Sequence, residues 1–315
     1  MTRDAAVPIT DDALRPIADR VQGGGRSHDL IGIGSLADLA NRAKNGDRVF
    51  FAANQHINPT NICVLRNVCT FCSFARTPTE EGAYTRTVAE VLAEASRAKS
   101  APTKEFHIVG GLHPRLPLRY YTDMIRALRD AHAGVHIKAL TAVEIAHLAR
   151  IEKTSILEVL LVLKDAGLTS LPGGGAEDFG TAVRASIADR KLAGEEWMAV
   201  HRQAHALGIP SNCTMLYGHV ETARDRAEHL LLLRALQDES GGFLTYWVTM
   251  GLRIGQVALR FGANDFGSVM MEENVVSAAG TTYRTSVEEM EALIRGAGFT
   301  PVRRRQDYSL IREAA

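Results

Sequence analysis

The chain has 315 residues, and its 36 Lys and Arg balance its 36 Asp and Glu, so the formal net charge is zero. This balance gives no overall basic field for nucleic acid, and 46% hydrophobic residues are typical of a globular protein. No apolar run reaches the roughly 20 residues that span a bilayer, and residues 1–4 do not begin a secretion leader. We therefore expect a cytoplasmic protein that binds neither nucleic acid nor membrane.

The chain begins with a polar stretch and then becomes regular. Residues 1–48 predict a helical N-terminal extension, with helical spacing of apolar residues over 36–44. The predicted strands are 49–51, 106–109, 135–140, 168–171 and 211–217, and residues 56–63 are predicted to be a strand that leads into a loop. The predicted helices are 88–99, 120–133, 143–150, 155–166, 194–207 and 223–238. We assign 49–250 to a core and 251–315 to a helical C-terminal extension.

Strands that alternate with helices indicate βα units and a parallel sheet. Glycines and polar residues follow the strands, and in a βα barrel these strand ends open onto one face. An open doubly wound sheet would instead gather them in a crevice. About five units in series, none with a G-x-G-x-x-G turn, favour the barrel.

Three of the four cysteines fall within ten residues. Cys63, Cys69 and Cys72 stand in a C-x5-C-x2-C spacing, and thiolates on one loop suit an Fe–S cluster or zinc. Zinc needs a fourth ligand, for which His56 or Cys213 is available, and three buried thiols without metal are a further alternative. We favour a [4Fe–4S] cluster with an open iron, where a small molecule can chelate, and we expect Cys213 to be core.

A cysteine triplet directly after the first strand of a βα barrel resembles the radical S-adenosylmethionine (SAM) superfamily. The resemblance implies an α/β fold, a partial (βα)6 TIM-like barrel. It also implies that Phe71 lies near the SAM adenine and that Gly110 and Gly111 hold the methionine amino group. The cluster would reduce the sulfonium of SAM to give a 5′-deoxyadenosyl radical, while the protein positions and shields it. A low-potential flavodoxin or ferredoxin is then the implied electron donor.

From about residue 48 to residue 310 the chain resembles the aminofutalosine synthases, transferases of the futalosine route to menaquinone. The strings that carry this likeness are NQHINPTNIC, EFHIVGGLHP, VHIKALTAVEI, SLPGGGAE, SNCTMLYGH and TYWVTMGLRIGQVALRFGAND. The implied reaction adds the adenosyl radical to 3-[(1-carboxyvinyl)oxy]benzoate. Rearrangement and loss of CO2 give 6-amino-6-deoxyfutalosine, so SAM is consumed. GGLHP and KALTAVEI favour this family over the related cyclic dehypoxanthine futalosine synthases and deazaflavin (FO) synthase components.

Two features depart from that family. Its cysteine spacing is C-x3-C-x2-C, so Asn67 and Val68 look like two extra residues, which cost little loop-closure entropy but require an outward bulge. After Gly242, several tens of residues that supply the sixth barrel strand are missing. Residues 244–249 are a candidate for that position, in a shortened sixth unit. A barrel that keeps the fold but not the activity is the alternative.

The substrate carries two carboxylates, which Arg binds better than Lys because its fork is bidentate. The candidates near the active-face loops are Arg66, Arg76, Arg115 and Lys138. Each has the alternative of a solvated surface charge.

The remaining candidates are acids, histidines and one tyrosine. Glu144 is expected to bind the SAM ribose or to stabilise a helix start, and Glu177 to bind a hydroxyl or ammonium group or to form a turn. His56 is a candidate proton relay, with a structural hydrogen bond as the alternative. His113 and His219 are candidates of the same kind, placed to meet the substrate, with a structural role as the alternative. Tyr217 is a candidate to hydrogen-bond the substrate or to donate an electron or hydrogen, with a packed aromatic as the alternative.

Overall fold

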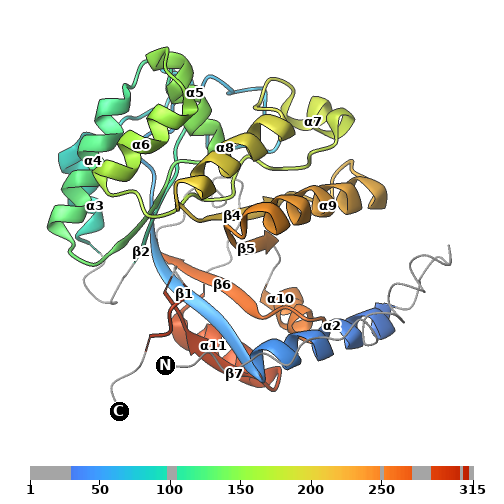
Figure 1. Cartoon of the computed structure of the whole chain (residues 1–315). Coiled ribbons are helices and arrows are strands. Elements are labelled where there is room, and N and C mark those ends of the chain that lie inside the picture. Colours follow the sequence, from blue (N-terminus) through green and yellow to red (C-terminus); the bar gives the residue numbers. More distant parts are fainter. Residues whose placement is uncertain (1–29, 98–104, 249–251, 272–284, 306–307, 312–315) are drawn as a thin grey trace. The chain divides into compact units, whose positions relative to one another are not determined.

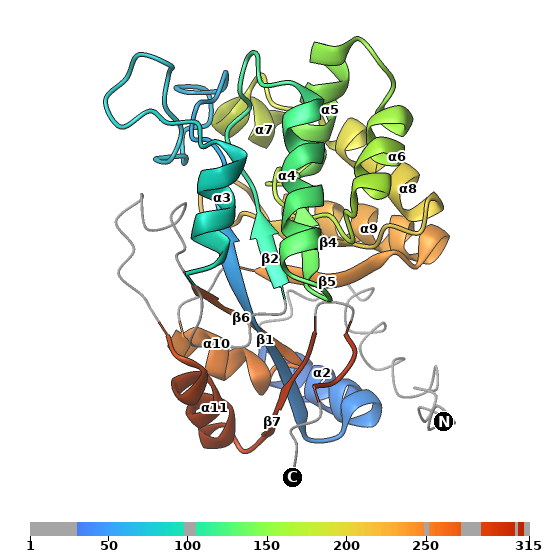
Figure 2. The same cartoon turned by 90° about the vertical axis from the view of Figure 1, so that its left-hand side faces the viewer.

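The computed structural model describes residues 30–97, 105–248, 252–271, 285–305 and 308–311. Contacts between residues divide the chain into two compact units. The larger unit contains the described residues from 53 to 248, and the smaller contains most of the described residues on either side. Figures 1 and 2 label the helices and strands.

The larger unit is built on parallel strands that follow one another in chain order. Its named strands are β1 (Arg48–Ile57), β2 (Glu105–Ile108), β3 (His136–Ala139), β4 (Ser211–Met215) and β5 (Phe243–Val248). β1 pairs with β2 and β2 with β3, all in parallel. Parallel bridges at Ser170 and Leu171 link β3 to β4, so the predicted strand 168–171 is reduced to these bridges. Six parallel segments therefore form the partial barrel that the sequence predicts.

The sixth position of this barrel is filled by β5, which pairs in parallel with β4. The prediction that residues 244–249 fill this place is confirmed in the described part of that segment. The preceding helix α9 (Ala223–Ser240) ends at Gly241, whose φ of 62° is left-handed. Only Gly241 and Gly242 separate α9 from β5, so the sixth unit is short.

Helices connect the parallel segments and cover the sheet on one side in Figure 1. They are α3 (Val88–Ala95), α4 (Leu118–Ala131), α5 (Ala142–Glu152), α6 (Ile156–Ala166), α7 (Thr181–Ala188), α8 (Gly194–Ala206) and α9. Capping boxes begin α3, α5, α6 and α9, where a Thr or Ser side chain accepts from the backbone N–H three residues on. The short helix α7 is not predicted from the sequence.

Residues 56–63 form a strand that leads into a loop, as predicted, and the strand ends at Ile57. The amide of Asn58 donates to the Val109 carbonyl at 2.8 Å, the Thr60 hydroxyl to the Tyr84 carbonyl at 2.8 Å, and the Asn61 amide to the Gly82 carbonyl at 2.9 Å. Polar side chains thus occupy backbone acceptors of neighbouring segments and hold residues 58–63 as a loop. The predicted strand 49–51 is the beginning of the same β1.

The smaller unit contains α2 (Leu30–Asn45), which includes the predicted helix 36–44, together with α10 (Leu252–Leu259), β6 (Asp265–Met271), α11 (Val287–Gly296) and β7 (Thr300–Arg303). β7 pairs in parallel with the first residues of β1. The C-terminal region is therefore not purely helical, because two strands join its helices. The rest of the predicted N-terminal extension, residues 1–29, lies outside the described residues. Across the described ranges, no helix has the length and apolarity needed to cross a membrane.

The packing of α6 gives a matched test of the core. Leu160 is fully buried, whereas the next residue, Leu161, is 46% exposed. We expect Leu160→Ala to lower the free energy of unfolding by about 2–5 kcal/mol, because it removes buried methyl groups and leaves a cavity. Leu161→Ala should change it by less than about 0.5 kcal/mol. Urea titration of the two variants measures both values, and equal losses would contradict this orientation of α6.

Candidate active site

The candidate residues lie where the parallel segments of the barrel end. The cysteine loop follows β1, Gly110 and Gly111 follow β2, and Glu144 begins the helix after β3. Glu177 follows the bridged segment at 170–171, and Tyr217 follows β4. Because all these segments are parallel, their ends share one edge of the barrel wall.

The cysteine loop is a turn held at both ends. The Leu65 N–H donates to the Cys63 Sγ at 3.4 Å, and the Thr70 N–H donates to the Ile187 carbonyl of α7 at 2.9 Å. Asn67, one of the two extra residues, is exposed and has a φ of 68°, a left-handed conformation that Asn tolerates better than most residues. The longer spacing is thus taken up within an exposed turn.

The electrostatics of the loop show that its thiols are neighbours. Burial raises the pKa of Cys63 and raises that of Cys69 to about 11. The Cys72 thiolate adds to both increases, whereas the ammonium of Lys191 opposes them. Within the described ranges no three His, Cys, Asp or Glu side chains are arranged as a ready metal site. Three soft donors on one loop are the ligand set of a [4Fe–4S] cluster with an open iron, whereas tetrahedral zinc needs a fourth.

The Gly-Gly segment after β2 lies directly against this loop. The Gly111 N–H donates to the Thr60 carbonyl at 2.8 Å. A Cβ on Gly111 would lie 2.3 Å from the Ile62 carbonyl oxygen, so only glycine allows this approach. The Gly110 N–H donates to Glu144 Oε1 at 3.0 Å, which links the segment to the start of α5.

Glu144 is buried and already has several donors. Its Oε2 accepts from the Thr141 N–H at 2.7 Å and from the Thr141 hydroxyl at 2.8 Å, which completes the capping box of α5. Burial raises the pKa of Glu144 to about 7, although these hydrogen bonds oppose the increase. The helix-start role is therefore present in the structure, and the ribose role stays a prediction.

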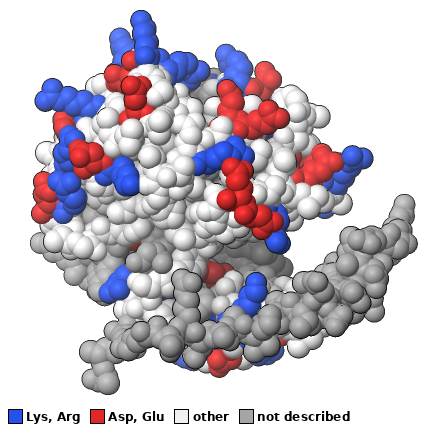
Figure 3. Space-filling view, in the orientation of Figure 1, with Lys and Arg blue, Asp and Glu red and all other residues white. Residues whose placement is uncertain are grey.

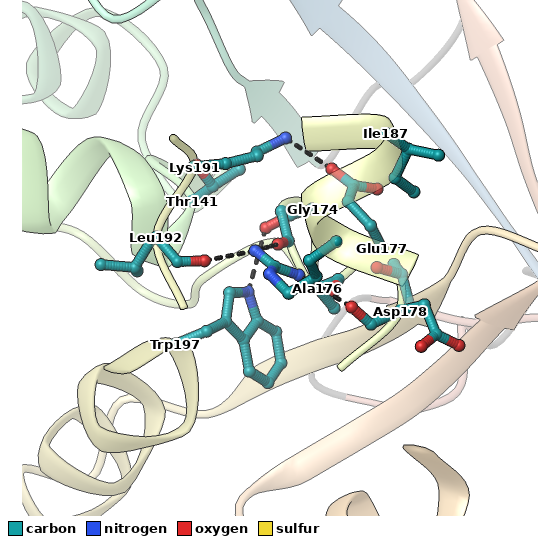
Figure 4. Close-up of polar contacts among 12 residues, drawn as sticks. Thr141, Gly174, Ala176, Glu177, Asp178, Ile187, Lys191, Leu192 and Trp197 are labelled. Carbon is teal, nitrogen blue, oxygen red and sulfur yellow. Dashed lines mark hydrogen bonds and ion pairs between the residues drawn. The ribbon is translucent and has the colours of Figure 1, made fainter. Parts of the chain in front are cut away.

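Glu177 forms an ion pair with a residue that the sequence analysis missed. Lys191 Nζ lies 2.5 Å from Glu177 Oε1, with both side chains nearly buried, as Figure 4 shows. The same ammonium lies 5.5 Å from the centre of the Phe71 ring. Glu177 has a φ of 46°, so its backbone is left-handed. Lys191 therefore joins the cysteine loop to the loop that carries Glu177.

Arg184 of α7 is the second residue that was missed. Its buried guanidinium donates to the carbonyl oxygens of Ala176 at 2.5 Å and Asp178 at 3.1 Å, and also to Leu192. These bonds fix the backbone on both sides of Glu177. No motif or spacing marks Arg184 or Lys191 in the sequence, and the only signal was an acid in a glycine-rich loop that needs a cation.

Three of the four predicted carboxylate-binding cations already have partners within the protein. Arg66 makes an ion pair with Glu80 at 2.7 Å. Arg76 donates to backbone carbonyls of its own loop, including Ala75 at 2.8 Å. Lys138 is fully buried in β3, 2.9 Å from Glu105. Arg115 is exposed on the loop that follows Gly111.

The predicted histidines and the tyrosine lie at different depths. His56 is buried in β1 beside His107, with ring centres 5.2 Å apart. The carbonyl of His113 lies 2.9 Å from His147 Nε2. His219 Nε2 lies 2.9 Å from the Leu216 carbonyl, and Tyr217 is 39% exposed. Cys213 belongs to the hydrophobic core, as expected.

Comparison with family models decides the class. The model described as the radical SAM superfamily matches residues 57–233, and one described as the CofH/MqnC C-terminal region matches residues 225–314. The chain belongs to the radical SAM superfamily. It is an enzyme of that family, whose members use a [4Fe–4S] cluster and SAM.

Two relatives carry the same name. An aminodeoxyfutalosine synthase of Thermus thermophilus is 36% identical over 364 residues, covering 96% of this chain and 97% of the relative. One of Streptomyces coelicolor is 37% identical over 343 residues, covering 91% of this chain and 88% of the relative. Both matches are longer than the 315 residues of this chain, so the relatives contain internal residues that it lacks.

Methylornithine synthase (PylB) shares the fold, with a TM-score of 0.62 at 16% identity over 93% of this chain and 94% of that chain.

The raised pKa of Glu144 predicts how stability depends on pH. A carboxyl with a folded pKa of about 7 and an ordinary value of 4.5 holds its proton more tightly when folded. Its contribution to the free energy of unfolding is complete below pH 4.5 and is lost as the pH rises through about 7. The total loss is on the order of 3 kcal/mol. We expect Glu144→Gln to remove this decline in the free energy of unfolding, measured by urea titration across that range.

Glu90 gives the matched control for Glu144. It occupies the same capping-box position in α3 but is exposed, and its hydrogen bonds to Thr87 lower its pKa. Its contribution is therefore lost as the pH falls, and Glu90→Gln should leave the decline toward neutral pH unchanged. A flat profile for the wild-type protein between pH 4.5 and 7 would contradict the assignment to Glu144.

Proposed function

We propose that this radical SAM enzyme adds the 5′-deoxyadenosyl group of SAM to 3-[(1-carboxyvinyl)oxy]benzoate and forms 6-amino-6-deoxyfutalosine. The observation that supports this most is the 36% identity to the Thermus aminodeoxyfutalosine synthase over nearly the whole of both chains. Rearrangement and loss of CO2 would follow the addition, and methionine would leave. The second relative of the same name supports the same substrate.

We assign the cofactor site to the described strand ends. Cys63, Cys69 and Cys72 would hold the cluster, whose reduced form supplies the electron that cleaves the sulfonium of SAM. Gly110 and Gly111 would hold the methionine amino group and Phe71 the adenine, because these residues border the cysteine loop. Glu144 and Glu177 are then the acids available to the ribose or ammonium of SAM.

The substrate carboxylates need cations at the same end of the barrel. Arg115 is exposed on the loop that follows Gly111, so its guanidinium is accessible to a ligand. Lys138 lies inside, 2.9 Å from Glu105. We therefore assign carboxylate binding to Arg115 first and Lys138 second. Arg66 and Arg76 would have to leave their present partners, and His113, His219 and Tyr217 would border the substrate.

The cluster also needs an external electron and a reducing compartment. A low-potential flavodoxin or ferredoxin is the proposed donor, and the cytoplasm is the proposed location, since thiols stay reduced there. His56 is assigned no proton transfer, because its surroundings are those of a buried structural group.

Mass spectrometry of an anaerobic reaction tests the proposed function. The reconstituted protein is incubated with SAM, dithionite and 3-[(1-carboxyvinyl)oxy]benzoate. We expect a product with the mass of 6-amino-6-deoxyfutalosine, formed in step with methionine. Free 5′-deoxyadenosine without that product would indicate a sibling substrate such as dehypoxanthine futalosine. Neither product, from protein with full iron and sulfide, would indicate a non-catalytic barrel.

Alanine variants of the four cysteines test the cluster assignment. We expect Cys63→Ala, Cys69→Ala and Cys72→Ala each to lose most of the bound iron and all SAM cleavage, because a cluster with three protein ligands does not survive the loss of one. Cys213→Ala is the matched control, since Cys213 packs in the core, and it should keep its iron. Iron and sulfide analysis after anaerobic reconstitution measures this, and full iron in a loop variant would contradict the ligand set.

A further inference from the structure

A pocket of about 680 Å³ lies beside the cysteine loop, among the helices of the larger unit. One face of α5 forms a wall, through Val143, Ala146, His147 and Arg150, and residues 190–192 and α8 form another. Leu65 of the cysteine loop also lines it. Neither Glu144 nor Gly110 is among its lining residues, whereas Lys191, which pairs with Glu177, is, so the pocket borders the proposed SAM site without including those two residues.

The charged residues that line this pocket are mostly positive. Arg150, Lys153, Arg190 and Lys191 line it, against the single acid Glu196. The chain as a whole is neutral, and on the face that Figure 3 shows, Lys and Arg side chains are interspersed with Asp and Glu. The lining of the pocket therefore differs in charge from the face that Figure 3 shows.

Most of these cations have no acidic partner. Lys191 is paired with Glu177, and Arg150 makes a hydrogen bond to His147 at 2.9 Å. In the part of the chain that the structure describes, no ion pair involves Arg150, Lys153 or Arg190. All three are exposed, so their charges face an incoming molecule.

Leu65 connects this pocket to the cysteines. Its N–H donates to Cys63 Sγ at 3.4 Å, and its carbonyl accepts from the Cys69 N–H at 3.4 Å. One residue in the pocket wall is thus bonded to two of the three proposed cluster ligands.

We propose that this pocket, with Arg150, Lys153 and Arg190 at its rim, is the docking surface for the acidic protein that reduces the cluster. The proposal rests on the proposed function, because it needs the cluster on the cysteine loop. Unpaired cations on an otherwise neutral protein steer an acidic partner and orient it on arrival. One electron would pass from the reduced carrier, which is oxidised, to the cluster that Cys63, Cys69 and Cys72 would hold, which is reduced, and no bond or proton would change place.

Charge reversal at the rim tests the proposal. The variant is Arg150→Glu with Arg190→Glu, and the control is Arg119→Glu with Arg234→Glu, two exposed arginines of α4 and α9 that change the net charge equally. Stopped-flow absorbance follows cluster reduction by reduced flavodoxin, without SAM or substrate. We expect the rim variant to slow reduction by about tenfold or more at low salt, and the control by less than about twofold.

Reduction by dithionite separates docking from damage to the cluster. The rim variant should be reduced by dithionite as fast as the wild-type protein. Slower reduction by both reductants would place the arginines in a small-anion or structural role and overturn the proposal, as would equal effects in the rim and control variants.

The readout does not depend on the substrate, so the proposal can stand even if the mass-spectrometric experiment finds another product. If no cluster assembles, flavodoxin binding to the cluster-free proteins, measured by calorimetry, decides. Equal affinities for all three proteins would then overturn the proposal.

Discussion

Parallel pairing of consecutive segments is the constraint on which the rest of the larger unit depends. A parallel neighbour requires a crossover connection, so each strand ends at the same edge of the barrel wall and the chain returns through a helix. The strand register also aligns polar side chains across the sheet. The successive cross-strand partners are His56, His107, Lys138 and Ser170. The wall therefore has one polar row across four segments and one edge that collects the cysteine, glycine and glutamate loops.

The acidic groups collected at this edge repel one another when they are ionised, which creates a second problem. The Cys72 thiolate and the Glu177 carboxylate add to the cost of ionising Cys69, which burial also raises. Lys191 offsets this cost. Burial alone would lower the pKa of Lys191, but the Glu177 carboxylate and the Cys69 thiolate outweigh burial and raise it, so the ammonium stays charged. A fixed positive charge beside thiolates is what an anionic iron–sulfur centre needs from its protein.

Sequence reasoning located the parts of the site that lie directly after predicted strands. The three cysteines stand out by residue type and spacing, and the role predicted for Gly110 and Gly111 comes from the family resemblance. Lys191 and Arg184 did not, because their positions depend on α7, an eight-residue helix after a glycine-rich loop. The residue at which β1 gives way to a loop was not predicted either, since Asn58 and Thr60 bind backbone groups that only the folded chain brings near. β6 and β7 were missed because their stability comes from pairing with distant β1.

The residues that the longer relatives contain and this chain lacks bear on activity more than on the fold. The barrel needs a sixth parallel segment beside β4, and β5 supplies it directly after Gly241 and Gly242, where the sequence predicts the shortening. Every residue assigned to the cluster, to SAM or to the substrate carboxylates lies before residue 220, so a deletion at this point removes none of them. A deletion there would take away wall around the substrate, and that loss would alter substrate selection and solvent exclusion before it altered SAM cleavage.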